Sequence, residues 1–166
     1  MTGDPTPLSH KTTGQSMSHG PGIRGEGFEE EFGISGEART LVPEGLYEAA
    51  CTDAEIVELF KFGRSRKLFL HFEINSGEHR GKAVFLPMGA PKQGGKVGVG
   101  SKLYATHLIA NGGKPPGRRD RLTLKVFKQK LFRVQIRTVQ PTFQDGSPKP
   151  SQFHYSIVAE LLERLA

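Results

Sequence analysis

Two segments of the sequence carry an apolar side chain at every second position. The first segment is residues 67–74, with Phe69 on the other face, and residues 131–139 repeat the pattern. The apolar positions are Leu68, Leu70, Phe72, Ile74, Phe132, Val134 and Ile136. A period of two places successive side chains on opposite faces of a β-strand. The pattern therefore predicts a sheet with one face buried in a core and the other turned to solvent.

Two more strands are expected before and after the first alternating segment. Residues 46–62 fit a long strand with a bend near residues 52–54, although a helix over residues 49–60 is a competing interpretation. Residues 75–77 (Asn-Ser-Gly) form a tight connection, and residues 82–88 supply the returning strand. The two strands that flank this connection are predicted to form a hairpin.

One helix is expected after a flexible loop. Residues 89–100 contain five glycines and one proline, so they predict a loop. Ser101 is a suitable N-cap for a helix over residues 102–111. Residues 122–127 fit either a short turn or a strand, and residues 140–153, with three prolines, predict a long loop.

The order of these elements predicts the fold class. A last strand begins at residues 155–158, and residues 159–166 either continue it or turn helical. The chain then reads strand, strand, strand, helix, strand, strand, which is the order of the five-stranded oligonucleotide-binding barrel, the OB-fold. We therefore expect a mainly β domain of this type over residues 41–166, with a disordered N-terminal tail over residues 1–40.

The expected tail differs from the rest of the chain in composition and charge. Residues 1–40 are rich in Gly, Ser, Thr and Pro, and too poor in aliphatic residues to offset the entropy of ordering. They carry a net charge of −3, whereas the whole chain carries +6, so residues 41–166 carry +9. One acidic and aromatic segment stands out, and it is either a solubilising linker or a short docking or autoinhibitory motif. It contains Phe28, Glu29, Glu30, Glu31 and Phe32.

The composition argues against several broad classes. No apolar run reaches the roughly 18 residues of a membrane span, and residues 1–20 do not resemble a secretory signal. Cys51 is the single cysteine, so an internal disulfide and a multi-cysteine metal site are excluded, and a buried thiol is expected. A reducing, cytoplasmic location is the simplest expectation. The basic body predicts a polyanionic partner such as nucleic acid.

Three short stretches resemble small single-stranded DNA-binding proteins of phages and other mobile genetic elements. Residues 41–47 (Leu-Val-Pro-Glu-Gly-Leu-Tyr) are similar to the opening strand of that family. Residues 70–74 (Leu-His-Phe-Glu-Ile), followed by residues 77–82 (Gly-Glu-His-Arg-Gly-Lys), and residues 155–158 (Tyr-Ser-Ile-Val) are similar to later strands. The resemblance covers roughly residues 41–162.

The resemblance implies an OB barrel that protects single strands during replication or recombination. Proteins of this kind often end in an acidic tail that recruits partners. This chain ends in residues 160–166 (Glu-Leu-Leu-Glu-Arg-Leu-Ala), which do not form such a tail. The acidic aromatic segment, Phe28 to Phe32, lies near the N-terminus instead. It is the candidate contact for a replication or recombination protein.

A groove for single-stranded nucleic acid needs cations along the backbone and flat rings beneath the bases. Such residues occur in the loop after the first strand, on the outer face of the second strand, in the hairpin and in the long loop before the last strand. The predicted binding residues are Lys61, Phe62, Arg64, Arg66, Lys67, Phe69, His71, Arg80, Lys82, Phe143, Lys149, Phe153 and Tyr155. Each aromatic residue has a competing interpretation as a part of the core, and Phe85 remains unassigned because Pro87 disturbs its strand.

A second basic cluster lies in the connector after the helix. Arg118, Arg119 and Arg121 flank Asp120, and they predict either a further phosphate contact or a solvated connector. Catalysis is not expected. The six histidines are scattered, the glycine-rich residues 94–102 lack the Walker pattern, and the carboxylates of the body are isolated. No metal or cofactor is predicted.

The leading hypothesis is a non-enzymatic, largely sequence-independent protein that binds single-stranded DNA by phosphate neutralisation and base stacking. Two alternatives stay open. One is a structural or protein-interaction β-barrel, such as a virion or conjugation component, and the other is an RNA-binding OB module.

Overall fold

The computed structural model describes residues 3, 31, 39–60, 65–118 and 120–166, and a compact unit runs from Ala38 to Ala166. Four residues predicted to bind nucleic acid lie outside the described residues, and so does most of the expected tail. The four are Lys61, Phe62, Arg64 and Arg119.

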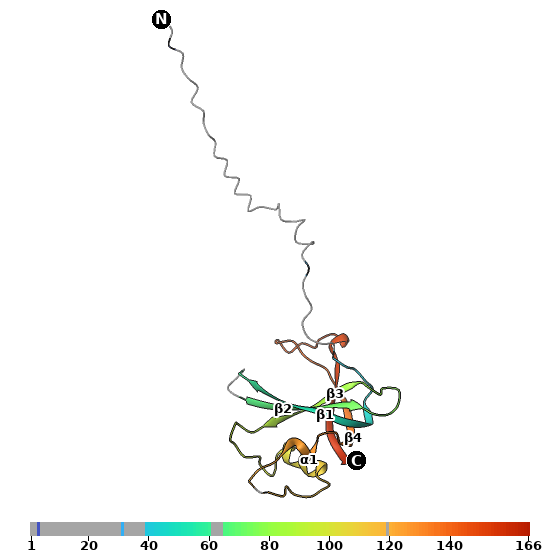
Figure 1. Ribbon diagram of the computed structural model, residues 1–166. Coiled ribbons are helices and arrows are strands. Elements are labelled where there is room, and N and C mark those ends of the chain that lie inside the picture. Colours follow the sequence, from blue (N-terminus) through green and yellow to red (C-terminus); the bar gives the residue numbers. More distant parts are fainter. Residues whose placement is uncertain (1–2, 4–30, 32–38, 61–64, 119) are drawn as a thin grey trace. The chain divides into compact units, whose positions relative to one another are not determined.

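Five antiparallel strands of the described chain form one sheet, in the order β3-β2-β1-β4-β5 (Figure 1). The strands are β1 (Gly45–Leu59), β2 (Ser65–Ile74), β3 (Ala83–Ala90), β4 (Leu131–Val139) and β5 (Tyr155–Arg164). One α-helix, α1 (Lys102–Ala110), follows β3. Two 3₁₀ turns, η3 (Leu124–Val126) and η4 (Ser151–Phe153), precede β4 and β5 respectively. The prediction of a mainly β chain with one helix between the third and fourth strands is confirmed.

β1 is the central strand because it pairs with both β2 and β4. Its first part, from Gly45 to Ala50, pairs with β4, and its part from Ala49 to Leu59 pairs with β2. The register with β2 shifts between Cys51 and Asp53, where one extra residue forms a bulge. The predicted bend is therefore confirmed, and the competing helix over residues 49–60 is wrong.

The bulge accompanies a curved sheet whose two edge strands meet. β3 and β5 stand at opposite ends of the strand order, yet they lie in contact. The rings of Phe85 on β3 and Tyr155 on β5 stack with centroids 6.2 Å apart and an interplanar angle of 18°. The outer surface of the sheet therefore continues from β2 through β3 to the start of β5.

The inner face of the sheet holds the core, as the alternating pattern predicts. The seven apolar side chains that alternate along residues 68–74 and 132–136 are all buried. A chain of aromatic contacts crosses this core from β2 to α1. The contacts are Phe72 with Phe132 (6.1 Å between centroids), Phe132 with Phe127 (6.4 Å) and Phe127 with His107 (6.2 Å).

α1 covers one end of the core and packs against β3 and β5. Ser101 begins the helix, since its hydroxyl accepts a hydrogen bond from the Tyr104 amide at 3.2 Å. Leu103, His107 and Ala110 are buried, so one face of the helix packs on the core. Gly112 follows the helix with φ of +68°, a left-handed conformation that suits glycine.

Some element boundaries differ from the predicted ones. β3 runs two residues beyond the predicted end at Met88, because Pro87 sits in an edge strand, where its missing amide can face away from the ladder. Leu124–Val126 forms a turn rather than a strand. β5 continues to Arg164, so the helical alternative for residues 159–166 is wrong. Within the described part of the chain, no helix has the length and apolar content needed to cross a bilayer.

The segment before β1 is hydrogen-bonded to the start of β5. The Ser156 amide donates to the Thr40 carbonyl at 2.8 Å. The Val42 amide donates to the Ser156 hydroxyl at 2.8 Å, and that hydroxyl donates to the Val42 carbonyl at 3.0 Å. Val42 is buried in the core, so the ordered chain already contacts β5 before β1 begins.

Cys51 provides a test of the core. Burial raises the pKa of its thiol to about 11, so almost no thiolate exists at pH 8. We expect its reaction with Ellman's reagent at pH 8 to be at least about 100-fold slower in the native protein than in denaturant, since the thiolate is the reactive form. Comparable rates in both states would show that Cys51 is exposed in the native protein.

Candidate nucleic-acid interface

Three aromatic residues form a continuous row on the outer surface of the sheet. Phe69 on β2 meets Phe85 on β3 edge to face, with centroids 5.7 Å apart. Phe85 in turn stacks on Tyr155 at the start of β5. All three side chains are half-buried, so each ring keeps a part of its surface accessible to solvent. We call Phe69, Phe85 and Tyr155 the aromatic row.

A cation lies over one end of the aromatic row. The guanidinium carbon of Arg39 stands 4.2 Å from the centre of the Tyr155 ring, which is a favourable cation–π distance. Arg39 is exposed, and the bond between Thr40 and Ser156 holds its backbone beside β5. A phosphate beside Tyr155 would therefore meet a positive charge.

The long loop between β4 and β5 is held together by its own hydrogen bonds. Thr142 and Pro148 form an antiparallel bridge, and the Phe143 amide donates to the Ser147 carbonyl at 2.8 Å. At the tip, the Asp145 carboxylate accepts bonds from the Ser147 hydroxyl at 2.6 Å and amide at 2.9 Å. These bonds lower the pKa of Asp145, because they stabilise the ionised carboxylate.

This loop presents two exposed rings with a lysine between them. Phe143 and Phe153 are 48% and 51% exposed, unusual values for phenylalanine. The ammonium nitrogen of Lys149 lies 5.5 Å from the centre of the Phe143 ring and 5.8 Å from that of Phe153. We call Phe143, Lys149 and Phe153 the loop cradle. His154 alone separates it in sequence from Tyr155, so it adjoins the aromatic row.

The charges beside the aromatic row are mixed. Lys67 is exposed on the outer face of β2. His71 lies on the same face, and its Nε2 atom is 3.2 Å from a carboxylate oxygen of Glu55 on β1. Asp53 stands opposite His71 on β1. The β1 side of the face is therefore partly acidic, whereas Arg39 and Lys149 make the side near β5 basic.

The hairpin between β2 and β3 carries two of the predicted cations. Arg80 and Lys82 are exposed at the turn between β2 and β3, whereas Lys67 lies near the opposite end of β2. The Lys82 ammonium lies 3.2 Å from Nδ1 of His79. Arg80 and Lys82 therefore lie at the opposite end of β2 from Lys67, and their part in binding stays a prediction.

Arg66 is already engaged within the protein. Its guanidinium donates to the Pro91 carbonyl at 3.1 Å, and its Nε atom lies 3.8 Å from a carboxylate oxygen of Glu58. The side chain is partly buried, so it ties the start of β2 to the segment after β3. A phosphate contact would have to compete with these interactions.

The second basic cluster is separate from the interface. Arg118 makes two hydrogen bonds with Asp120, at 2.9 and 3.0 Å. Arg121 is exposed and lies with Arg118 beside α1. Figure 1 shows α1 and the loop of residues 140–154 at opposite ends of the sheet.

Two members of the interface are absent from the predicted set. Phe85 was left unassigned because of Pro87, yet the pairing of His71 with Phe85 places this ring on the outer face. Arg39 falls in the expected tail, and its contact with Tyr155 joins segments more than 100 positions apart in the chain. Alternation continued through Pro87 predicts that Phe85 lies on the outer face. No local pattern in the sequence indicates the contact of Arg39.

No protein-family model matches this chain, and no curated protein matches it significantly. Among the residues that the structure describes, no three His, Cys, Asp or Glu side chains are grouped so that they could hold a metal ion.

The exposed rings of the loop cradle are expected to contribute little to stability. Phe143→Ala and Phe153→Ala should each change the free energy of unfolding by less than about 0.5 kcal/mol, because these rings are largely exposed. Phe132→Ala, the control in the core, should cost about 3–5 kcal/mol. Urea unfolding followed by circular dichroism measures all three. A loss above about 2 kcal/mol for a cradle variant would assign that ring a structural role.

Proposed function

We propose that this protein binds single-stranded DNA across the aromatic row and the loop cradle, with little sequence preference. The observation that carries the proposal is the loop cradle: two exposed phenylalanines with an ammonium group between them, adjoining further rings. Exposed rings supply stacking surfaces for any base, and the cations neutralise nearby phosphates. Single-stranded DNA is exposed and bound by proteins during replication and recombination, so we propose that this protein acts in those processes.

We further propose that the domain is an OB barrel. The strand and helix order supports this, as does the position of β1 between β2 and β4. The contact between β3 and β5 brings together the two strands that close such a barrel. In this fold, oligonucleotides lie across the face of the second and third strands and against the loop before the last strand, which is where the rings gather.

A second candidate function is a protein-interaction module. Exposed apolar side chains on β1 and just after it favour this alternative, since Ile56, Leu59 and Phe60 are not covered by other described residues. The carboxylates of Asp53 and Glu55 also repel phosphate on that side of the face. An RNA-binding module would use the same rings and cations, and it differs through contacts to the 2′-hydroxyl.

The first experiment is a fluorescence-anisotropy titration with labelled oligo-dT, oligo-U and duplex DNA of equal length. We expect oligo-dT to bind more tightly than duplex, because the rings need unpaired bases. Raising the salt from 50 to 200 mM should weaken the binding, because neutralised phosphates release counterions. Tighter binding of oligo-U would favour the RNA module. No binding by well-folded protein at low salt, with and without residues 1–38, would refute the proposal and favour the interaction module.

Single substitutions test the loop cradle itself. Phe143→Ala and Phe153→Ala should each weaken oligo-dT binding about 5- to 150-fold, which corresponds to about 1–3 kcal/mol of stacking per base. Val99→Ala is the matched control, since it also shortens an exposed apolar side chain but lies in the loop before α1. Equal affinities for all three variants and the parent would place the site elsewhere.

The lysine of the cradle should act through charge. Lys149→Gln should weaken oligo-dT binding and make it less dependent on salt, with a slope of log K against log[salt] about 0.7 smaller in magnitude. Lys125→Gln removes an exposed lysine beside α1 and serves as the control. An unchanged slope for Lys149→Gln would mean that Lys149 does not neutralise a phosphate.

A further inference from the structure

A cavity lies between α1 and the connector that leads to β4. Its volume is about 340 Å³, within the range of about 300–1,000 Å³ that small-molecule sites occupy. Its walls are mostly apolar, with a few polar groups at defined positions, as in ligand sites. The lining residues are His107, Asn111, Pro116, Gly117, Arg118, Arg121, Thr123 and Val126.

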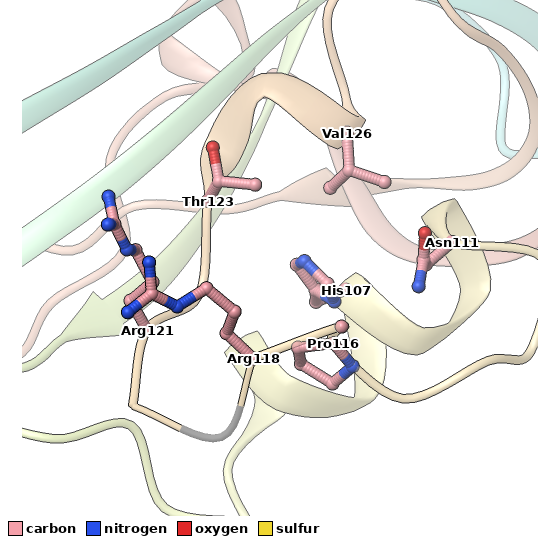
Figure 2. A pocket seen from close by; sticks show the side chains of 8 residues that line it. His107, Asn111, Pro116, Arg118, Arg121, Thr123 and Val126 are labelled. Atoms are coloured by element: carbon pink, nitrogen blue, oxygen red, sulfur yellow. The ribbon is translucent and has the colours of Figure 1, made fainter.

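His107 stands at the centre of this cavity (Figure 2). Its side chain is 2% exposed, and its Nδ1 atom has no hydrogen-bond partner among the described residues. Burial lowers the pKa of His107, so the ring is neutral at pH 7 and carries one donor and one acceptor. A buried nitrogen without a partner is costly, and because Nδ1 is closed to solvent, a ligand would supply the missing hydrogen bond only by turning the ring toward the cavity.

The groups on the two sides of His107 differ in charge. Figure 2 shows Arg118 and Arg121 on one side of the imidazole, and Asn111 and Val126 on the other. No carboxylate of the described residues forms an ion pair with Arg121, whereas Arg118 shares its charge with Asp120. The arginine side is therefore suited to an anion.

The opposite side is suited to an uncharged group. Both amide hydrogens of Asn111 are engaged, because Nδ2 donates to the carbonyls of Lys114 at 2.9 Å and Pro115 at 3.2 Å. This arrangement fixes the amide and leaves its oxygen as an acceptor. Pro116 and Val126 add apolar surface, against which a flat ring could pack.

We infer that this cavity binds a nucleoside monophosphate, with the phosphate at Arg121 and Arg118 and the base between His107 and the Asn111 side. Arginine forms two parallel hydrogen bonds with a phosphate, and both guanidinium groups are exposed and open to such a group. The ligand is either a free nucleotide or the phosphorylated end of a strand, because both carry the same group. The inference does not depend on the proposed interface, which lies at the other end of the sheet (Figure 1).

Isothermal titration calorimetry of the full chain with AMP and with dTMP tests the site. We expect saturable binding with a Kd below about 1 mM, and clearly weaker binding of the corresponding nucleosides. Arg121→Gln should weaken nucleotide binding at least about tenfold, because a charge-assisted pair is lost. Arg137→Gln, an exposed arginine on β4 outside the cavity lining, should leave binding unchanged.

A second variant fills the cavity without disturbing the fold. A Cβ atom on Gly117 would meet no atom within 4 Å, so Gly117→Leu is expected to fold and to block the site. It should abolish nucleotide binding and leave the stacking of oligo-dT on the loop cradle intact. The inference is overturned if AMP and dTMP give no heat of binding, or if Arg121→Gln and Gly117→Leu bind them as the parent does.

Oligonucleotides with and without a 5′-phosphate separate the two sources of the ligand. If the cavity takes a strand end, the phosphorylated oligonucleotide binds more tightly, and Gly117→Leu removes that advantage. If it takes a free nucleotide, the two oligonucleotides bind alike while AMP still binds. Each result supports the cavity as a phosphate-ester site. Loss of oligo-dT binding in Phe143→Ala, with AMP binding retained, would show that the two sites act independently.

Discussion

The whole sheet depends on the ability of β1 to pair on both sides. Its first residues bond to β4 and its later residues to β2, and the bulge after Cys51 lies near the point where pairing with β4 ends. In a flat sheet of five strands, β3 and β5 would be roughly 19 Å apart, four times the spacing of neighbouring strands. The curvature brings Phe85 and Tyr155 into contact instead. The aromatic row is thus a product of the same backbone feature that shapes the core.

Much of the fold could be predicted from local patterns. Alternation identified β2 and β4 because their inner faces are buried throughout, and the change of parity in residues 46–62 indicated the bulge. The end of β5 could not be predicted from alternation, because register shifts interrupt the pattern and leave Leu161 buried but Leu162 exposed. Sheet curvature depends on contacts between distant strands, which no local window contains.

The candidate site was less predictable, because it is assembled from separate segments. The loop cradle could be foreseen, since two phenylalanines and a lysine in a polar, proline-rich loop lack a core to fill. The positions of Arg39 and Arg66 could not. Arg39 reaches Tyr155 through a cation–π contact, and Arg66 contacts a carbonyl and a carboxylate of its own chain. The sequence thus shows how many cationic side chains the chain carries, whereas the fold determines which of them are already engaged in contacts within the protein.

The internal bonds of the loop between β4 and β5 have a thermodynamic consequence. The bridge between Thr142 and Pro148 and the bonds from Ser147 to Asp145 order the loop when the protein folds. Gly146 supports the turn with φ of +85°, a conformation that other residues adopt poorly. A ligand that stacks on Phe143 then meets rings that are already arranged, and it bears little of the entropic cost of ordering them. If the loop cradle binds single strands, Asp145 and Gly146 act on affinity through preorganisation, although neither residue carries a ring on which a base could stack.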